Sequence, residues 1–483
     1  MKPLQFILLL ALMIAGSNIY TQNFGDALRY SFYEPMGTAR FIGSGSALAP
    51  LGADFSVIST NPAGLAWMRK SEFSISAGLH INRTESTLVN GGDNLPFDDS
   101  DAMFNLPNIG LVTASRGGRS METFNFAIGV NRLADFNQEI FYQGTSRGSI
   151  VQRFEELAND TGLDDFEAGV AYDADAIYTD NNNFYVSDFT RFADATIERE
   201  QQITRSGGLS ELAFGFAGNV EDRFLWGIAL GVPFLNYQEV KSYRESDPDD
   251  NVVYFDDLSY NEQLTTTGSG INLKLGFIYR VHQALRLSAA VHTPTYYQIS
   301  ESFNTDMSYD YTLEDGTYAG AAASPSGEFR YNLLTPWRFT GGVGAVFSDK
   351  GFLSGEIEYV NYTGNQFVFE GFSTDEAAIN REIEKNLSSA ISIRTGAEVA
   401  VNNFRLRGGV GLQQSPVEGD NNFYSTLSLG AGVRQKHFFA DFAYRRQSAK
   451  TSFSPYLTAE APQLFVDTDE LNENFVFTIG FRF

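Results

Sequence analysis

Hydrophobic and polar residues alternate with a period of two over long stretches of the chain. In 473–483 one face carries Phe475, Phe477, Ile479, Phe481 and Phe483, and the other carries Thr478, Gly480 and Arg482. Successive side chains of a β-strand point to opposite faces of its sheet. The pattern therefore predicts strands that each have one apolar and one polar face.

Fourteen segments show this pattern. They are 71–84, 106–116, 121–137, 210–220, 223–241, 267–281, 284–301, 335–348, 351–364, 388–400, 402–416, 421–434, 436–449 and 473–483. Short connections, such as 116–119 and 220–223, alternate with long ones, such as 138–209 and 302–334. Bacterial membrane barrels have an even number of antiparallel strands, short periplasmic turns and long extracellular loops. The predicted fold is all-β, a 14-stranded antiparallel transmembrane β-barrel over 71–483 with both termini in the periplasm.

A soluble β-sandwich also alternates, and composition separates the two folds. The chain has 42 Phe, 23 Tyr and 45 Gly in 483 residues, a load that aromatic girdles and crowded barrel positions explain. After the first 22 residues no window of about 18 residues is apolar enough for a transmembrane helix. The sequence therefore favours the barrel.

Two segments precede the predicted barrel. Residues 1–22 hold Lys2, an apolar run over 6–16 and a polar exit, which is typical of a cleaved signal peptide. Residues 23–70 do not alternate and are rich in small residues, which allow close backbone packing. We expect 23–70 to form a plug, or hatch, inside the lumen. The absence of cysteine excludes a lipid-modified cysteine, disulfides and thiolate zinc sites.

The connection 138–209 is long enough to have its own structure. Within 149–163, Ile150, Phe154, Leu157 and Ala158 recur at helical spacing and predict a short amphipathic helix. Loops of this length often act as lids or binding elements. A helix that only packs on the extracellular rim is the alternative.

Charge narrows the possible functions. A net charge of −25 argues against nucleic acid as a partner and is explained by acidic extracellular loops. Charged residues also gather on the predicted lumenal face: Arg338, Glu356, Glu358, Arg394, Glu398, Arg405, Arg407, Asp441, Arg445 and Arg482. Their mixed signs indicate ion pairs that fix the plug to the wall, rather than a polar conduction path.

Other chemistry finds little support. The histidines His80, His282, His292 and His437 have no metal-ligand spacing, and the acidic stretch 247–257 is typical of a solvated loop more than of a calcium site. No serine-hydrolase, metalloprotease or phosphate-loop motif occurs. We expect no metal, no cofactor and no enzymatic activity.

The plug segment resembles a known family. It contains Met-Gly-x-Ala-Arg at 36–40, Gly-x-x-x-Ala-x-Ala at 43–49, Asp-x-Ser at 54–56 and Asn-Pro-Ala-Gly-Leu at 61–65. This order, just before the first strand, resembles the hatch of the outer-membrane long-chain fatty-acid transporter family, which includes aromatic-hydrocarbon transporters (FadL and TodX). The barrel pattern extends the resemblance along the chain.

The resemblance implies passive uptake of long-chain fatty acids or other apolar small molecules by a monomer embedded in outer-membrane lipid. In the family the ligand leaves through a lateral opening at a distorted strand or past a rearranged hatch. Asn61, Pro62, Ala63 and Gly64 carry over as the hatch turn. The candidate ligand contacts are Phe24, Phe32, Phe41, Phe55 and Trp67, with plain plug packing as the alternative for each. Some relatives act instead as carriers in type IX protein secretion, which is the second functional hypothesis.

Overall fold

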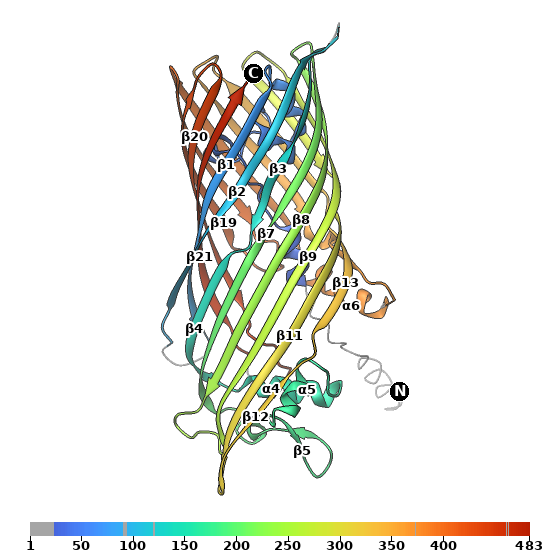
Figure 1. Ribbon diagram of the computed structural model, residues 1–483, viewed down its shortest axis with the longest axis vertical. Coiled ribbons are helices and arrows are strands. Elements are labelled where there is room, and N and C mark those ends of the chain that lie inside the picture. The colour runs from blue at the N-terminus through green and yellow to red at the C-terminus, as the bar shows by residue number, and fades with distance from the viewer. Residues whose placement is uncertain (1–23, 90–93, 119–120, 372, 460, 462) are drawn as a thin grey trace, which may run out of the picture.

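The strands close into a single antiparallel cylinder (Figure 1). The computed structural model describes residues 24–89, 94–118, 121–371, 373–459, 461 and 463–483. Strand β1 (Glu72–Leu88) pairs with β2 (Phe97–Arg116) on one side and with β21 (Val466–Arg482) on the other, which closes the ring. The predicted 14-stranded barrel is confirmed. The predicted signal peptide, 1–22, lies outside the described residues.

The other barrel strands follow one another around the ring, and four of them are interrupted. Their segments are β3 (Met121–Asp135) with β4 (Gln138–Arg147), β7 (Thr196–Val220), β8 (Phe224–Ser246), β9 (Phe255–Arg280), β10 (Leu285–His292) with β11 (Tyr296–Leu313), β12 (Gly316–Ala323) with β13 (Gly327–Leu334) and β14 (Arg338–Val346), β15 (Gly351–Asn361) with β16 (Gln366–Val368), β17 (Ser389–Val401), β18 (Phe404–Gln414), β19 (Phe423–Arg434) and β20 (Phe438–Phe453). The turns that join β7 to β8, β9 to β10, β14 to β15, β17 to β18 and β19 to β20 lie at the end of the cylinder that also holds the C-terminus, whereas the two-residue turn between β11 and β12 lies at the opposite end (Figure 1).

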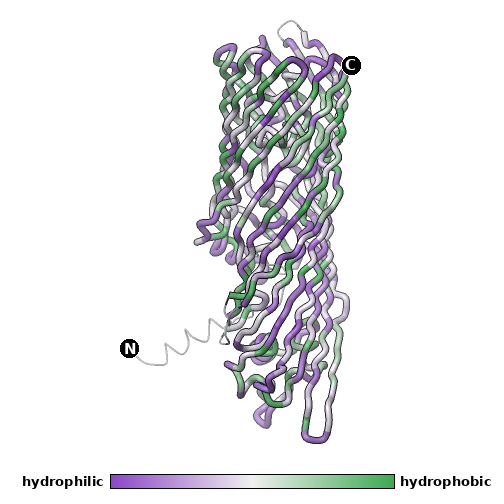
Figure 2. Tube along the Cα trace, turned by 90° about the vertical axis from the view of Figure 1, so that its left-hand side faces the viewer, coloured by the Kyte–Doolittle hydropathy of each residue, from purple (hydrophilic) through white to green (hydrophobic). Residues whose placement is uncertain are grey.

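An apolar band surrounds the cylinder on the side of the short turns. On β8 the outward positions from Phe224 to Phe234 are all hydrophobic, whereas the next two, Asn236 and Gln238, are polar. Those 11 residues match the roughly 9–11 that a tilted strand needs to cross a bilayer. The rest of β8 extends beyond the membrane, and the tube in Figure 2 shows the cylinder continuing as a narrower extension toward the extracellular end.

This extension explains where the predicted boundaries were wrong. Strand β7 begins at Thr196 and not at 210, and β4 lies inside the predicted loop 138–209. Outside the membrane both faces of a strand meet water or polar loops, so the alternation that identified the strands fades. The loop itself is shorter and holds α4 (Ile150–Asp160), which confirms the helix predicted in 149–163, together with α5 (Ala168–Asp173), β5 (Tyr178–Thr179), β6 (Tyr185–Val186) and η3 (Asp188–Thr190).

A buried arginine anchors this loop at the extracellular end. The Arg199 side chain has no exposed surface, and its Nη1 donates to Glu245 Oε1 (3.2 Å) and Tyr456 Oη (2.8 Å). Glu245 in turn accepts from the Ile150 backbone N–H (3.0 Å) at the start of α4, where Ser149 is the N-cap. Burial raises the pKa of Tyr456 to about 12, so its phenol stays neutral. The arginine thereby ties the helix to the barrel wall.

The lumen is filled by the segment before β1, as predicted. This plug consists of α2 (Phe24–Ser31), α3 (Ala39–Gly43) and two 3-10 turns, η1 (Phe55–Ser59) and η2 (Pro62–Trp67). Short side chains cap three of these elements: Thr38 Oγ1 accepts from Phe41 N (3.1 Å), Asp54 from Ser56 N (3.0 Å) and Asn61 from Ala63 N (3.2 Å). The plug and the inner wall share one continuous apolar core.

Two helical elements remain. The 3-10 turn η4 (Tyr362–Gly364) follows β15, and α6 (Ser373–Asn386) packs on α2 through Ile379 and Ile383. In the described part of the chain, every helix is too short or too polar to cross a bilayer.

The apolar band predicts that the loss of stability caused by an arginine substitution depends on its position along β8. We expect Leu230→Arg to lower the free energy of unfolding by about 2–4 kcal/mol, because it places a guanidinium in hydrocarbon. Gln238→Arg, on the same face beyond the band, should change it by about 0–1 kcal/mol. Equilibrium urea unfolding in phospholipid vesicles measures both, and equal losses in the two variants would contradict the assigned band.

Candidate functional site

The third barrel strand is broken, and the wall is unpaired beside the break. Strand β3 ends at Asp135 and β4 begins at Gln138. The β2–β3 ladder stops at the pair Asn108–Asn131, and within the described residues β4 pairs only with β7. We call the unpaired stretch between 97–107 of β2 and 132–147 the seam. It is the distorted third strand that the sequence did not locate.

Glycine in the facing strand makes the break possible. Gly207 has φ +114°, and a Cβ there would lie 2.2 Å from the Asn236 carbonyl oxygen. Its own carbonyl accepts from Phe136 N (3.2 Å) and from Arg132 Nη2 (2.8 Å), and its N–H donates to Asn137 Oδ1 (3.3 Å). The break is thus held by hydrogen bonds to one point on β7, and a residue with a side chain at 207 would not fit there.

The seam begins within the apolar band. Asn105 of β2 lies opposite Gly78 of β1, and Gly78 lies opposite Val476 of β21. On β21 the outward residues are apolar from Phe475 to the C-terminus. The periplasmic end of the seam therefore lies at the height of the extracellular leaflet of the bilayer. Nearby, Phe104 is 82% exposed, and Met103, which points to the opposite face of β2, is 40% exposed.

A cavity of about 160 Å³ lies in the lumen between the plug and the seam. We call it the lumenal cavity. The plug contributes Phe32, Tyr33, Glu34 and Met36, the broken strand Leu133, Ala134 and Asp135, and the opposite wall His80, Gln413, Tyr424, Arg445, Gln447, Asn472 and Asn474. It lies between the inner side of the seam and the extracellular side of the plug.

The lumenal cavity has an apolar side and a polar side. Phe32 and Tyr424 face each other at 5.0 Å between ring centroids, next to Leu133 and Met36. The polar groups are mostly paired with one another: Arg445 with Glu34, His80 Nδ1 with Asn474 Oδ1 (3.0 Å), and Asp135 Oδ2 with Asn105 Nδ2 (2.9 Å). An apolar molecule therefore finds aromatic surface there without displacing unpaired charges.

On the periplasmic side of the lumenal cavity the plug is tightly packed. Asn61, Pro62, Ala63 and Gly64 are buried against the wall: a Cβ on Gly227 would lie 2.3 Å from the Pro62 carbonyl carbon, and one on Gly276 would lie 2.0 Å from Asn61 Oδ1. Asn61 Nδ2 also donates to Ala49 O (3.1 Å). The hatch turn is thus a packed wedge against β8 and β9, and it does not line the lumenal cavity.

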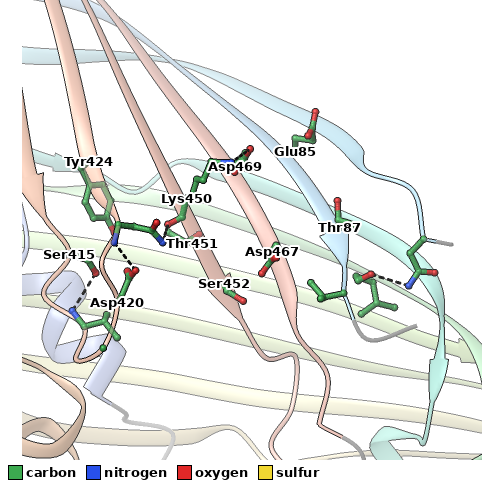
Figure 3. A pocket seen from close by; sticks show the side chains of 16 residues that line it. Glu85, Thr87, Ser415, Asp420, Tyr424, Lys450, Thr451, Ser452, Asp467 and Asp469 are labelled. Atoms are coloured by element: carbon green, nitrogen blue, oxygen red, sulfur yellow. Dashed lines mark hydrogen bonds and ion pairs between the residues drawn. The ribbon is translucent and has the colours of Figure 1, made fainter. Parts of the chain in front are cut away.

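A larger cavity, of about 1000 Å³, lies at the extracellular rim of β1, β20, β21 and the 415–422 connection (Figure 3). We call it the rim cavity. Its charged lining consists of Glu85, Asp420, Asp467, Asp469 and Lys450, where Lys450 is paired with Asp469 (2.9 Å). Tyr424 lines both this cavity and the lumenal one. Glu85, Asp467 and Asp469 are exposed and alternate with buried inward positions of β1 and β21, so these acidic side chains gather on the outer side of the rim.

Ion pairs fix the plug and brace the wall, which is the arrangement that the sequence indicated. Wall pairs are Arg338–Glu358 (3.2 Å), Arg394–Glu356 and Arg394–Glu358 (both 3.6 Å), Arg405–Glu398 (3.8 Å), Arg407–Glu398 (2.7 Å), Arg407–Asp441 (2.6 Å) and Arg482–Glu72 (2.8 Å). Arg445 pairs with Glu34 of the plug, and Arg338 donates to Ser31 O. Glu211 pairs with Lys274 and accepts from Ser59 Oγ (2.9 Å).

The predicted aromatic contacts have different positions. Phe32 lines the lumenal cavity, whereas Phe41 and Phe55 are buried in the plug core. Phe24, the first residue of α2, packs against the apolar cluster that α2 shares with the wall. Trp67 lies toward the periplasmic side, stacked on Arg286 at 4.1 Å. Sequence reasoning missed Tyr33, Met36, Leu133, Ala134 and Tyr424. The available signal was the Gly-Gly pair at 207–208 and the Asp-Phe-Asn interruption at 135–137.

A closed barrel with an internal plug and a broken third strand defines the fold of a plugged channel. No family model and no curated protein sequence matches the chain. Among solved structures, a FadL homologue of Pseudomonas aeruginosa is similar with a TM-score of 0.57 at 11% identity, over 93% of this chain and 99% of that one. The toluene transporter TodX of P. putida gives 0.52 at 10% identity, over 92% and 98%. The chain therefore has the FadL and TodX fold.

The buried ion pair between Lys274 and Glu211 should contribute more to stability than an exposed ion pair does. Lys274→Met leaves the Glu211 carboxylate in a buried site without its cation, and we expect a loss of about 3–5 kcal/mol in the free energy of unfolding. Lys450→Met breaks the exposed pair with Asp469 and should lose at most about 1 kcal/mol. Urea unfolding midpoints compare the two, and an unchanged midpoint for Lys274→Met would show that this pair does not hold the plug.

Proposed function

We propose that this protein is an outer-membrane channel for passive uptake of small apolar molecules, which leave the lumen sideways through the seam. The observation that carries the proposal is the position of the lumenal cavity: it touches the seam on one side and the packed plug below. The FadL and TodX fold supports it, because the compared structures include a toluene transporter.

The physical problem that such a channel solves is the polar outer layer of the membrane. An apolar solute crosses hydrated, charged head groups poorly, and burial of apolar surface is the main favourable term once it reaches a pocket. Phe32, Leu133 and Tyr424 offer such surface inside the wall, and Phe104 and Met103 offer it beside the seam. Apolar surface is therefore present both in the lumenal cavity and beside the seam.

The lateral route follows from the packing of the plug on the periplasmic side of the lumenal cavity. The plug core there is buried and packed against glycines of the wall. Passage downward requires displacement of buried ion pairs and hydrogen bonds, whereas the seam already lacks ladder hydrogen bonds. The hatch turn at 61–64 then acts as a fixed floor.

The charges favour uncharged substrates. Four carboxylates and one lysine line the rim cavity, so a fatty-acid anion meets repulsion at the entrance that a neutral hydrocarbon does not. We therefore infer that neutral, hydrocarbon-like molecules are taken up better than long-chain carboxylates. The type IX carrier hypothesis gains no support from the compared structures.

Locking the seam tests the route. Because the chain has no cysteine, Asn105→Cys/Asp135→Cys introduces one pair across the seam, at two side chains that already touch (2.9 Å). A short bifunctional thiosulfonate reagent joins them, and dithiothreitol releases them. In cells lacking the native gene, uptake of radiolabelled toluene should fall to background after cross-linking and recover after reduction.

A second cysteine pair, placed where the ladder is intact, controls for effects of the reagent that do not depend on the seam. Ser425→Cys/Ser448→Cys joins two outward hydroxyl positions, 2.9 Å apart, on β19 and β20, where the ladder is intact. Its cross-link should leave uptake unchanged. Normal uptake through the locked seam would refute lateral exit, and equal background uptake of toluene and oleate with and without the gene would refute the channel function altogether.

A further inference from the structure

A third cavity, of about 390 Å³, lies at the opposite, periplasmic end of the barrel. We call it the periplasmic cavity. Five arginines from five elements line it: Arg40 of the plug, Arg286 of β10, Arg405 of β18, Arg434 of β19 and Arg482 of β21. The lining also includes Asp349 and Glu398. The cavity thus gathers cations, in contrast to the acidic rim cavity.

The carboxylates around the periplasmic cavity are shared. Glu398 lies 2.7 Å from Arg407 and 3.8 Å from both Arg40 and Arg405. Asp441 is 2.6 Å from Arg407 and only 3.9 Å from Arg434. Of the five lining arginines, Arg482 has the closest carboxylate partner, Glu72 at 2.8 Å. Arg40 also lies 3.9 Å from Asp54. The lining itself holds five arginines and two carboxylates, so positive charge predominates at the cavity surface.

Arg286 is the strongest sign of that excess. Among the described residues no carboxylate lies within ion-pair distance of it; its Nη1 donates to Leu51 O (3.0 Å) and its guanidinium stacks on Trp67 at 4.1 Å. The buried Nε atoms of Arg40, Arg286 and Arg434 have no hydrogen-bond partner in the described structure. The same holds for the Nε atoms of Arg132, Arg199, Arg394 and Arg445 elsewhere in the barrel, so what distinguishes this cavity is the convergence of five arginines on it and the lack of a carboxylate beside Arg286.

We propose that the periplasmic cavity is a binding site for a phosphate-type oxyanion. Guanidinium groups match phosphate oxygens as paired donors and keep their charge when partly buried. Several converging arginines favour a ligand with more than one negative charge, and 390 Å³ leaves room for a phosphate that carries an organic group. The ligand is either the head group of an inner-leaflet phospholipid or a free phosphate compound. The site rests on the fold and not on what the channel transports.

Binding of inorganic pyrophosphate to the detergent-purified full-length protein tests the site. Isothermal titration calorimetry should show saturable binding to the wild type. Arg286→Gln/Arg405→Gln should weaken it at least about tenfold, because two of the five guanidiniums are lost. Arg191→Gln removes an exposed arginine of the extracellular loop and should bind as the wild type does. Absent saturable binding, or equal binding to the double variant, overturns the proposal.

A gentler variant guards against misfolding. Arg405 donates to the neighbouring carbonyls of Asn402 (2.7 Å) and Phe404 (2.8 Å) and lies 3.8 Å from Glu398. Glu398 keeps its closer partner Arg407 (2.7 Å), so Arg405→Gln alone should retain a melting temperature close to that of the wild type while pyrophosphate binds several-fold more weakly. Unchanged pyrophosphate affinity in this folded variant counts against the site.

Competition distinguishes the two sources of the phosphate. Displacement of pyrophosphate by dihexanoyl phosphatidylglycerol at lower concentrations than by glycerol phosphate assigns the site to a lipid head group. Equal displacement by both assigns it to free phosphate compounds. Failure of both to displace pyrophosphate contradicts a phosphate ligand. Because no transported molecule enters this assay, its outcome is independent of the seam experiment.

Discussion

The backbone of a strand in lipid has no water to satisfy its polar groups, and this constraint governs the molecule. Every N–H and C=O in the hydrocarbon must be paired within the protein, which only helices and closed barrels achieve. The ring from β1 to β21 meets the requirement almost everywhere. At the seam it is met differently: Arg132 O accepts from Met36 N of the plug (2.9 Å), and Glu139 O accepts from Thr84 Oγ1 (2.6 Å). The plug and a side chain of β1 thus take over backbone pairing that the missing ladder would have supplied, and a gap in the ladder becomes compatible with a stable barrel.

The interior combines tight packing with a division of charge. Glycines of the wall bring the plug into direct contact: a Cβ on Gly110 would lie 2.3 Å from the Phe55 ring. Carboxylates predominate among the charged residues of the rim cavity, and arginines predominate among those of the periplasmic cavity. The plug therefore lies between two regions of opposite charge.

The alternation of side chains predicted much of the fold, because lipid imposes it. On β8 the run from Phe224 to Phe234 is unmistakable, and the strand was located within a few residues. Residues 196–209 have polar side chains on both faces, so no pattern distinguished them from loop. The site was harder to predict. The break after Asp135 depends on Gly207, more than 70 residues later, and on Met36 of the plug, so no local sequence signal determines it. Phe32 was predicted as a ligand contact because it is aromatic and in the plug, but the same reasoning gave Phe41 and Phe55, which are buried in the plug core.

The contacts of the plug also constrain how the chain is assembled. Its first segments are made before any strand, yet they bond to the last ones: the Ala39 N–H donates to Thr478 Oγ1 of β21 (2.7 Å), and Glu34 pairs with Arg445 of β20. Asn125 of β3 already holds Leu65 O (2.7 Å). The hydrogen bond and ion pair to β21 and β20 can form only once these last strands are in place. The earliest-made residues of the plug therefore complete their bonding last.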